Sequence, residues 1–328
     1  MSTETRTPDE RNRLPLLKPA ANFFEFVRDN QIQLFPRQIQ EGASVFGEWC
    51  ENCNPDLRLY NETYDEIARK AAFTVHDRCP LCHQRKALDA HWHSTLSIGQ
   101  RGGKGVLLAA MALYVEHRTL CHPLGLEPGS AVIAIIADTE NIGIEITDLI
   151  GTFRKQSSWF RDYHTLLTRN KLQKPQAKPG NYHYPHLNLW TRVLPRDTMV
   201  QGKFLIFAGL DEPAWFDAVD DQASFAEVLR ACNNGCVTVR RRVLQDPTLF
   251  GGYVVSVSSP HHVNDTFDKA LKRTGERYYS CKIPTWNMHP HYTSEMFDTE
   301  FRKNSVSANR DFGVRIVHDS EISASSDL

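Results

Sequence analysis

A glycine-rich segment, residues 99–105 (GQRGGKG), constrains the fold of this chain more than any other feature of its sequence. Residues 94–98 before it have the pattern of a short strand, and residues 106–115 after it are apolar all round, as in a buried helix. A loop of this composition between a strand and a helix can wrap backbone N–H groups around phosphates and place the Lys104 ammonium beside them. A simple glycine-rich turn is the alternative, but the flanking strand and helix favour phosphate binding.

A second motif follows later in the chain, where the apolar segment 204–210 ends in Asp211 and Glu212. The first acid at the tip of such a strand can hold Mg²⁺, and the second can polarise an attacking water. In the glycine-rich segment, Arg101 could stabilise charge on a γ-phosphate, or it could be an ordinary solvated loop arginine. The two motifs together predict a site of nucleotide hydrolysis with Glu212, Lys104 and Arg101 as its catalytic residues.

Further nucleotide contacts are expected around these motifs. Gly105 stands where a Ser or Thr would give Mg²⁺ a hydroxyl ligand, so either water takes that place or hydrolysis is impaired. Two serines end the predicted strand 252–259 and can sense the γ-phosphate, although an ordinary exit from a strand explains them nearly as well. The residues predicted to bind the cofactor are Gly99, Gln100, Arg101, Gly102, Gly103, Lys104, Gly105, Asp211, Ser258 and Ser259, and Asp211 is the predicted magnesium ligand.

Four of the eight cysteines form two Cys-x-x-Cys pairs with 25 residues between them. Two such chelating turns supply a tetrahedral set of thiolates for Zn²⁺, and a redox pair is the alternative. The spacer is longer than in a usual zinc ribbon, and His76 or His83 could replace one thiolate. We expect a zinc-ribbon-like lobe inserted at residues 48–91, with a role in folding. The predicted zinc ligands are Cys50, Cys53, Cys79 and Cys82.

The remaining segments alternate between strand and helix patterns. Residues 131–137 are apolar throughout, as in a strand buried on both faces of a parallel sheet. Further strands are expected at 187–193, 204–211 and 252–259, helices at residues 22–30, after Gln38 as far as Trp49 and at 223–231, and a surface excursion at 171–186. This alternation predicts an α/β fold, a P-loop NTPase of the ASCE type with a parallel sheet covered by helices.

The composition limits what the chain can contact. Its 328 residues, 41% of them hydrophobic, are enough for one large core or two modest ones. The formal charge of −1 shows no basic bias, so DNA contacts would come from local clusters such as 240–242 and 271–273, which a solvated charged face explains equally well. No apolar run approaches the roughly 18 residues that span a bilayer, and no signal peptide is visible. We expect a cytosolic protein without membrane contact.

In this order, the motifs resemble those of the ATPase portion of a tailed-bacteriophage terminase large subunit, the motor that packages DNA. The resemblance runs from Phe35 to Val314. Residues 99–105 resemble the family's variant phosphate loop, and residues 35–38 (FPRQ) its adenine-contacting segment, which makes Gln38 the base-reading amide of the cofactor site. The acidic motif corresponds to LDEPAWF at 210–216, the coupling motif to VVSVSSP at 254–260 with residues 264–266, and the linker to residues 283–290, 300–303 and 310–313.

The resemblance implies an ATPase that uses ATP and Mg²⁺ to move double-stranded DNA into a procapsid, in the cytoplasm of an infected bacterial host. It also implies a homo-oligomeric ring that contacts a portal protein and a small terminase subunit. In such a ring an arginine completes the neighbour's site, and Arg196 is a candidate.

The resemblance also divides the chain into an N-terminal arm (1–34), a P-loop ATPase domain (35–282) and a linker (283–328). Family members usually continue into a nuclease domain, and too few residues follow Gly313 for one, so we expect no nuclease activity from this chain. Two other functions stay open. One is a non-hydrolysing nucleotide- and DNA-binding assembly module, in which Gly105 has cost the activity. The other is a helicase-like DNA remodeller.

Overall fold

One mixed sheet organises the residues that the computed structural model describes, which are 17–50, 52, 78–79, 82–84, 91–126, 130–196, 203–218 and 222–315. Its strand order is β3-β4-β5-β2-β6-β7-β1-β8. The strands are β1 His93–Ile98, β2 Ala131–Ile136, β3 Gln176–Lys178, β4 Asn181–Tyr184, β5 Leu189–Val193, β6 Phe204–Asp211, β7 Tyr253–Ser258 and β8 Tyr278–Ile283. From β5 to β8 in this order the neighbours run parallel, whereas the β3–β4 and β4–β5 pairs at one edge are antiparallel.

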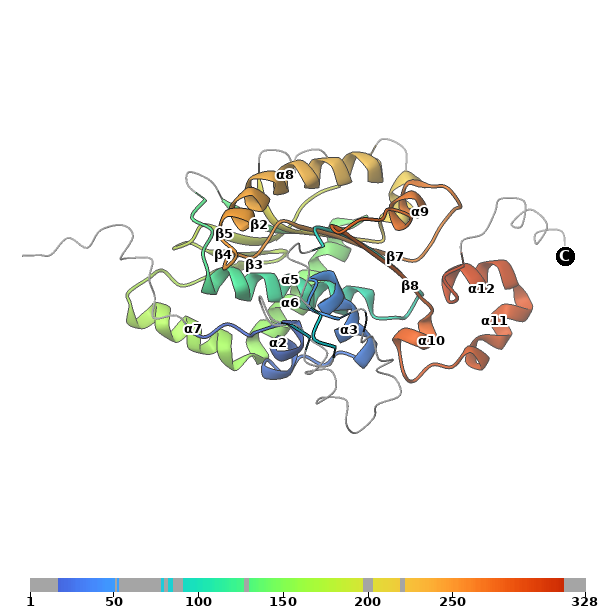
Figure 1. The fold of residues 1–328 in the computed structure, drawn as a ribbon, viewed down its shortest axis with the longest axis horizontal. Coiled ribbons are helices and arrows are strands. Elements are labelled where there is room, and N and C mark those ends of the chain that lie inside the picture. The colour runs from blue at the N-terminus through green and yellow to red at the C-terminus, as the bar shows by residue number, and fades with distance from the viewer. Residues whose placement is uncertain are drawn as a thin grey trace, which may run out of the picture.

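Helices cover both faces of this sheet, as Figure 1 shows, with α8 and α9 on one side and α5, α6 and α7 together with α2 and α3 on the other. The longer helices are α3 Pro36–Val45, α5 Lys104–Cys121, α6 Glu140–Gln156, α7 Ser158–Arg169 and α8 Phe225–Gln245. The shorter ones are α2 Phe23–Asp29, α9 Thr266–Leu271, α10 Thr285–Met288, α11 Asp298–Lys303 and α12 Ser305–Asp311, with 3₁₀ turns η4 Pro213–Ala218 and η5 Ser294–Phe297. The predicted α/β fold with a mainly parallel, helix-covered sheet is therefore confirmed.

The centre of the core is α5. All residues from Leu107 to Val115 have no exposed surface, because the sheet lies on one side of this helix and α2, α3 and α6 lie on the other. The apolar pattern without a polar face predicted this burial. Strand β2 (AVIAII) is also buried along its whole length, as expected for an interior strand of a parallel sheet.

The first described helix is part of that core. Phe23 and Phe26 of α2 are fully buried, and their rings lie 5.5 and 5.1 Å from the ring of Tyr114 on α5. Residues 22–29 were expected to precede the ATPase domain as part of an arm, but they pack as one of its layers. The next helix, α3, ends at Val45 rather than near Trp49.

Two segments differ from the sequence-based expectation. The surface excursion expected at 171–186 contains the β3–β4 hairpin, which extends the sheet, and Tyr184 in it is fully buried. The reason is a buried carboxylate, Glu116 on α5, to which the Tyr184 hydroxyl donates a hydrogen bond of 2.8 Å. The helix expected at 223–231 continues to Gln245, so the basic run at 240–242 lies on a helix.

Beyond β8 the chain forms a small helical unit, α10 to α12, which lies beside the end of the sheet in Figure 1. It is held together by aromatic contacts, among them a stacked pair of Phe297 and Phe312 with ring centroids 4.4 Å apart. Within the described part of the chain, none of the helices has the length and apolar character required to cross a bilayer.

Candidate nucleotide-binding site

The two sequence motifs meet at one edge of the sheet. Strands β6, β7 and β1 are parallel neighbours, so their carboxyl ends bring Asp211, Ser258 and the glycine-rich loop to the same side. The loop, residues 99–103, joins β1 to the first residue of α5, Lys104. Ligands of open parallel sheets bind at this edge, and a helix N-terminus there adds free N–H groups and a positive dipole.

The backbone of the loop depends on its glycines. Gly103 has a φ of +73°, in the left-handed region that residues with a Cβ rarely adopt, and a Cβ there would lie 2.4 Å from Nε2 of Gln38. A Cβ on Gly102 would lie 2.6 Å from Cγ2 of Ile98. Gly105 is different, because a Cβ there would meet only Cγ1 of Ile146 at an ordinary 3.7 Å. The glycine at 105 is therefore not required by sterics.

Lys104 points at the acidic motif. Its Nζ lies 2.9 Å from Oε1 of Glu212, donates a hydrogen bond of 2.9 Å to Oγ of Ser259 and lies 3.4 Å from the Ile98 carbonyl. The Lys104 and Glu212 side chains are 10% and 31% exposed, so the ion pair lies at the floor of an accessible edge. Four residues predicted for the site (Lys104, Glu212, Ser258 and Ser259) are thus brought together from three strand ends.

Glu212 is held in a defined position. Its backbone has a φ of +50°, which is uncommon for a residue with a side chain, and its N–H donates to the Val257 carbonyl at 2.8 Å. Its Oε2 accepts hydrogen bonds from Oγ of Ser258 at 2.8 Å and from the backbone N–H of Ser259 at 2.9 Å. A residue in this conformation persists only when its surroundings determine it, and such residues concentrate at functional sites.

Asp211 lies next to this pair and is only 9% exposed. Burial, followed by the negative charge of Glu212, raises its pKa to about 7, and the positive charge of Lys104 acts in the opposite direction. A buried carboxyl group with a raised pKa lacks compensating positive charge. A divalent cation would supply that charge, so Asp211 fits the role of a magnesium ligand.

The Gln38 side chain holds the backbone of the glycine-rich loop. Its Oε1 accepts a hydrogen bond of 2.8 Å from the Phe35 N–H, and its Nε2 donates to the carbonyls of Gly102 and Gly103 at 3.1 and 3.3 Å. The side chain is thereby committed to backbone groups and the residue is almost fully buried. To read a base, as the sequence resemblance implies, it would have to release these bonds.

The first half of the loop is held by a segment that we assigned only to the linker. The Gln100 carbonyl accepts a hydrogen bond of 2.7 Å from the Thr285 hydroxyl, and the Gly99 and Gln100 N–H groups donate to the carbonyls of Ile283 and Asp311 at 3.1 and 2.6 Å. No local pattern marks Thr285, because it is brought to the loop by the pairing of β8 with β1. Arg101, the remaining predicted catalytic residue, lies exposed at the tip of the loop with a φ of +62°.

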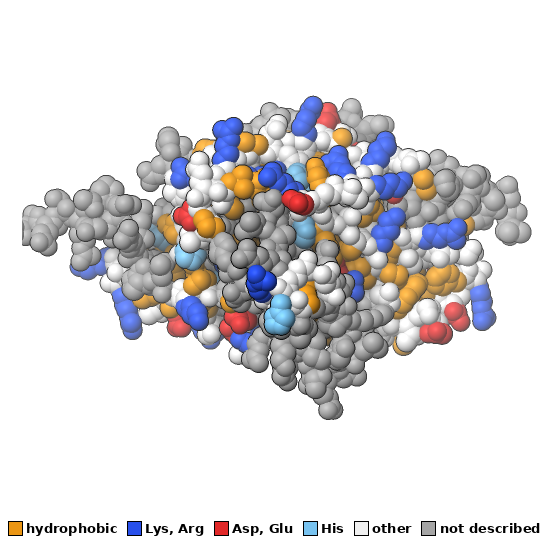
Figure 2. All heavy atoms as spheres, viewed as in Figure 1, with side chains coloured by type: hydrophobic (Ala, Val, Ile, Leu, Met, Phe, Trp, Pro, Cys, Tyr) orange, Lys and Arg blue, Asp and Glu red, His pale blue; other side chains and the backbone are white. Residues whose placement is uncertain are grey.

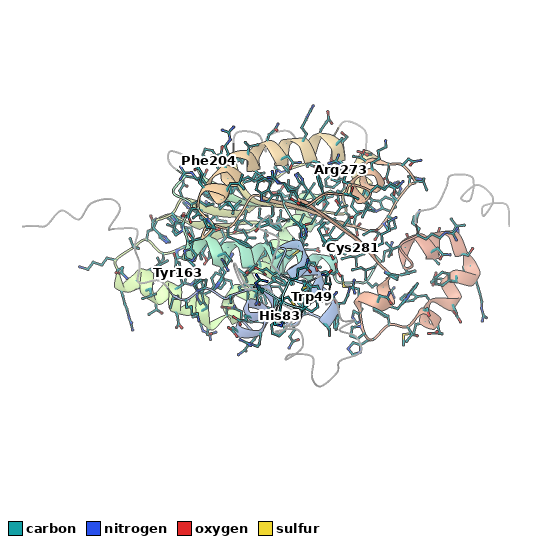
Figure 3. The ribbon with its side chains drawn as sticks, in the orientation of Figure 1. Trp49, His83, Tyr163, Phe204, Arg273 and Cys281 are labelled. Carbon is teal, nitrogen blue, oxygen red and sulfur yellow. The ribbon has the colours of Figure 1, made fainter. Side chains whose placement is uncertain are left out.

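Three of the predicted zinc ligands converge. The sulfurs of Cys50, Cys79 and Cys82 lie within 4.8 Å of one another, and the Sγ atoms of Cys50 and Cys82 are 3.5 Å apart. The Cys79 carbonyl accepts a hydrogen bond of 2.8 Å from the backbone N–H of His83, whose φ is +59°. Cys53, His76 and most of the expected lobe lie outside the described residues. In Figure 3, His83 and Trp49 lie on the α2–α3 side of the sheet.

The two basic clusters proposed for DNA differ in exposure, because Lys272 and Arg273 are exposed whereas part of the cluster at 240–242 is buried. Arg240 is 8% exposed, and its guanidinium donates to the carbonyls of Gly252 and Trp92 at 2.7 and 3.1 Å, so it holds α8 to the sheet. Arg242 donates to the Leu124 carbonyl at 2.7 Å. On the face seen in Figure 2, Lys and Arg side chains are spread over several elements rather than gathered in one block. The interpretation of 240–242 as a phosphate-contacting cluster is therefore wrong for Arg240.

Arg196, the candidate for completing a neighbour's site, faces inward. Its side chain is 1% exposed, it pairs with Asp138 at 2.6 Å, and its guanidinium lies 4.9 Å from the Phe216 ring centre. In this conformation it does not project from the surface.

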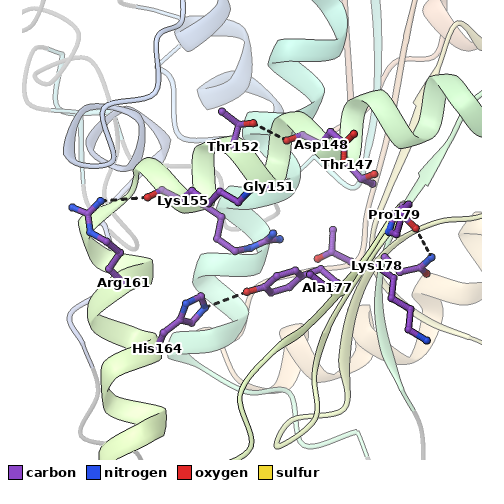
Figure 4. Close-up of a pocket in the computed structure, with 15 residues that line it drawn as sticks. Thr147, Asp148, Gly151, Thr152, Lys155, Arg161, His164, Ala177, Lys178 and Pro179 are labelled. Carbon is purple, nitrogen blue, oxygen red and sulfur yellow. Dashed lines mark hydrogen bonds between the residues drawn. The ribbon is translucent and has the colours of Figure 1, made fainter.

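A cavity of about 790 Å³ lies away from this edge, between α6, α7 and the β3–β4 hairpin (Figure 4). Lys155, Arg161 and Lys178 line it, and its wall contains a 3.3 Å contact between the Tyr182 hydroxyl and Nε2 of His164. None of the residues of the two motifs lines it, so its size does not make it the site of the chemistry that the motifs predict.

No protein-family model matches the sequence, and no curated protein is similar to it at a significant level. Among solved structures, the chain is similar to the large terminase ATPase domain of Thermus phage P74-26, in a single-residue mutant and in the unmutated form. Both matches have 15% identity and cover 78% of this chain, with 99% and 98% of those chains covered and TM-scores of 0.45 and 0.44. The HK97 bacteriophage large terminase matches at 13% identity over 73% of this chain and 52% of its own, with a TM-score of 0.44. These are structures from the family that the motifs resemble.

Proposed function

We propose that this chain binds ATP with Mg²⁺ at the edge formed by β1, β6 and β7 and hydrolyses it. The observation that carries the proposal is the 2.9 Å approach of Lys104 to Glu212, because two motifs far apart in sequence become one site. A phosphate-binding amine and a water-activating carboxylate at adjoining strand ends are the arrangement that nucleotide hydrolysis requires.

Each residue has a distinct role in this proposal. Lys104 leaves Glu212 when nucleotide enters and binds the β- and γ-phosphates, together with the N–H groups at the start of α5. Glu212, released from the amine but still oriented by Ser258 and the N–H of Ser259, accepts a proton from the attacking water. Asp211 would hold Mg²⁺, which neutralises charge on the phosphates.

The wider function rests on the sequence resemblance. We propose that hydrolysis drives movement of double-stranded DNA into a procapsid, in a ring of such chains that acts with a portal protein and a small terminase subunit. Such a motor would hold DNA by its phosphates, because it must move any sequence. Ser258 contacts Glu212, and Ser259 contacts both Glu212 and Lys104, which would let these serines report the state of the γ-phosphate.

The direct test is Mg²⁺-dependent release of phosphate from ATP, with DNA present and absent. Glu212→Gln should abolish release while leaving ATP binding within about threefold, because it removes the base but not the phosphate contacts. Glu145→Gln, an exposed acid on α6, is the matched control and should behave like the wild type. Equal rates in the wild type and Glu212→Gln would defeat the assignment.

A non-hydrolysing assembly module is the second candidate, and Gly105 favours it because it supplies no hydroxyl for Mg²⁺. The space beside Gly105 allows a sharp test, since a serine side chain fits there. If the wild type binds ATP without hydrolysing it and Gly105→Ser gains hydrolysis, the module is the correct function. If the wild type hydrolyses ATP, water serves in place of that hydroxyl.

We further propose that Cys50, Cys79 and Cys82, with Cys53 as the fourth ligand, hold a structural Zn²⁺. Convergence of three thiols from segments far apart in sequence supports a metal over a redox pair. Metal analysis of purified protein should find roughly one zinc per chain. Cys79→Ser should lose it, and Cys232→Ser, a buried cysteine on α8, should retain it. Less than about half an equivalent in the wild type would contradict the site.

A further inference from the structure

The glycine-rich loop is gripped by the C-terminal part of the described chain. We call residues 283–313 the clasp. Three hydrogen bonds join it to the first half of the loop: Gly99 N–H to the Ile283 carbonyl at 3.1 Å, Gln100 N–H to the Asp311 carbonyl at 2.6 Å, and the Thr285 hydroxyl to the Gln100 carbonyl at 2.7 Å. The two ends of the clasp are themselves joined, because the Thr285 N–H donates to the Phe312 carbonyl at 2.9 Å.

The fit between the clasp and the loop leaves no room for a side chain. A Cβ on Gly99 would lie 2.3 Å from Oγ1 of Thr285 and 2.6 Å from the carbonyl oxygen of Phe312. Thr285 is completely buried in this contact. The glycine at 99 is therefore explained by the clasp, and not by an unusual backbone angle, since its φ is not positive.

The second half of the loop is reached by the same segment through another route. Gln38 holds the carbonyls of Gly102 and Gly103, and the ring of Phe35, at the start of α3, lies 4.0 Å from the ring of His289 in the clasp. The first half of the loop therefore contacts the clasp directly, and the second half contacts it indirectly through α3. Because both halves are connected to the clasp in this closely packed arrangement, a shift of the clasp would change the loop.

We propose that Thr285 is a positioning residue of the nucleotide site, which sets the loop through the Gln100 carbonyl, and that nucleotide binding is thereby coupled to the conformation of the clasp. This inference rests on the proposed function, because it needs a nucleotide at the loop. Coupling of this kind is reciprocal: if the clasp favours nucleotide binding, bound nucleotide stabilises the clasp by the same factor.

The first test separates the hydroxyl from the bulk of Thr285. Thr285→Val keeps the shape but removes the donor, and it should weaken ATP–Mg²⁺ binding about three- to tenfold, the worth of one neutral hydrogen bond. Thr285→Ser restores the donor and should bind within about twofold of the wild type. Inorganic tripolyphosphate should show the same loss in Thr285→Val, since the effect acts on the phosphate loop and not on a base. Equal affinity of all three proteins for both probes would overturn the proposal.

The second test uses a matched pair of glycines. Gly99→Ala pushes a methyl group into Thr285 and should weaken binding of ATP more than Thr285→Val does, while Gly151→Ala on α6, whose methyl would meet no atom within 4 Å, should not. Binding by Gly99→Ala at the wild-type affinity would overturn the role of the clasp even if Thr285→Val failed to fold.

The coupling has its own readout in Trp286, beside Thr285, whose ring lies 6.1 and 6.4 Å from the rings of Phe297 and Phe301. Trp215 also lies near the site, three residues after Glu212, so only the part of the emission change that Trp286→Phe removes reports on the clasp. ATP–Mg²⁺ should change the tryptophan emission of the wild type, and Trp286→Phe should make that change smaller. An undiminished change in Trp286→Phe, or no change in a wild type that binds ATP, would contradict the coupling. A wild type that binds neither ATP nor tripolyphosphate would instead refute the proposed function, and the inference with it.

Discussion

Two ion pairs near opposite ends of α5 differ in how they are held. Glu116, near the end of the helix, has no exposed surface and accepts four hydrogen bonds: from Nε and Nη2 of Arg154 at 2.9 and 2.7 Å, from the Tyr184 hydroxyl at 2.8 Å and from the Thr191 hydroxyl at 2.5 Å. The Arg154 guanidinium also lies 3.6 Å from the Tyr182 ring centre. Lys104, at the start of the helix, meets Glu212 through a single ion contact at a partly exposed edge.

The Glu116 pair therefore has the features of a permanent structural contact, and the Lys104 pair has those of a contact that can exchange partners. Each carboxylate oxygen of Glu116 accepts two hydrogen bonds from protein groups, so exchanging a partner of this carboxylate would only lose interactions. The Lys104 pair leaves both charges near solvent and beside Asp211, whose carboxyl is destabilised as an anion. In the proposed function, an incoming polyanion with a divalent cation would exchange these partners.

The largest effect is expected at the buried pair. Glu116→Gln should reduce the free energy of unfolding by about 3–5 kcal/mol, because it leaves the buried Arg154 charge without a counter-charge. Denaturant unfolding measures this, with the exposed Glu145→Gln on α6 as a control that should change stability by less than about 0.5 kcal/mol. A decrease in the free energy of unfolding below about 1 kcal/mol would mean that the Glu116–Arg154 pair does not stabilise the fold as expected.

At Asp211 we expect a smaller effect of opposite sign, because substitution should increase the free energy of unfolding at high pH. Its folded-state pKa, about 7, lies above the ordinary value of 3.8, so the folded state keeps a proton that the unfolded state releases. Stability contributed by this group is complete below about pH 4, falls as the pH rises to about 7 and is lost above that, with an upper bound of about 4 kcal/mol.

Asp211→Asn removes this pH dependence and should stabilise the protein at pH 8 by about 2 kcal/mol. The quantity to measure is the difference in the free energy of unfolding between the wild type and Asp211→Asn. This difference is needed because burial lowers the pKa values of His93 and His117 to about 4 and about 3, so that these two residues change stability with pH in the opposite direction. A difference that stays constant from pH 4 to pH 8 would contradict the raised pKa.

The smallest effect on stability is expected at Lys104. Lys104→Met should change the free energy of unfolding by less than about 1 kcal/mol, because the pair is partly exposed and screened. The same substitution should abolish detectable ATP binding, which isothermal titration would show. A loss of stability above about 2 kcal/mol would place this pair in the same structural class as Glu116 and remove the contrast.

Much of the fold could be predicted because its signals are local. The apolar run at 106–115 and the wholly apolar strand at 131–136 specify their own burial, whatever surrounds them. The hairpin at 176–184 could not be found in this way, because its pattern is polar and its one buried tyrosine depends on a carboxylate far away in sequence.

The candidate site also has features that local sequence signals predict and features that they do not. The types of residue at the site, an amine after glycines and acids after an apolar strand, follow from the sequence alone, and their action on a nucleotide stays a prediction. Sequence reasoning assigned Gln38 to a base and counted Arg240 among exposed cations. The structure places the Gln38 amide under the loop and Arg240 between α8 and the sheet.

By itself, then, the sequence determined the strands β1, β2, β6 and β7, the buried centre at α5 and the chemical groups available at the strand ends, because each depends on residues close together in the chain. The tertiary structure alone decided that Thr285 and Phe312 close on Gly99, and that the Ser259 N–H at the end of β7 holds the Glu212 carboxylate. Those contacts arise from parallel pairing between strands that are distant in sequence, and no local pattern encodes which strand ends become neighbours.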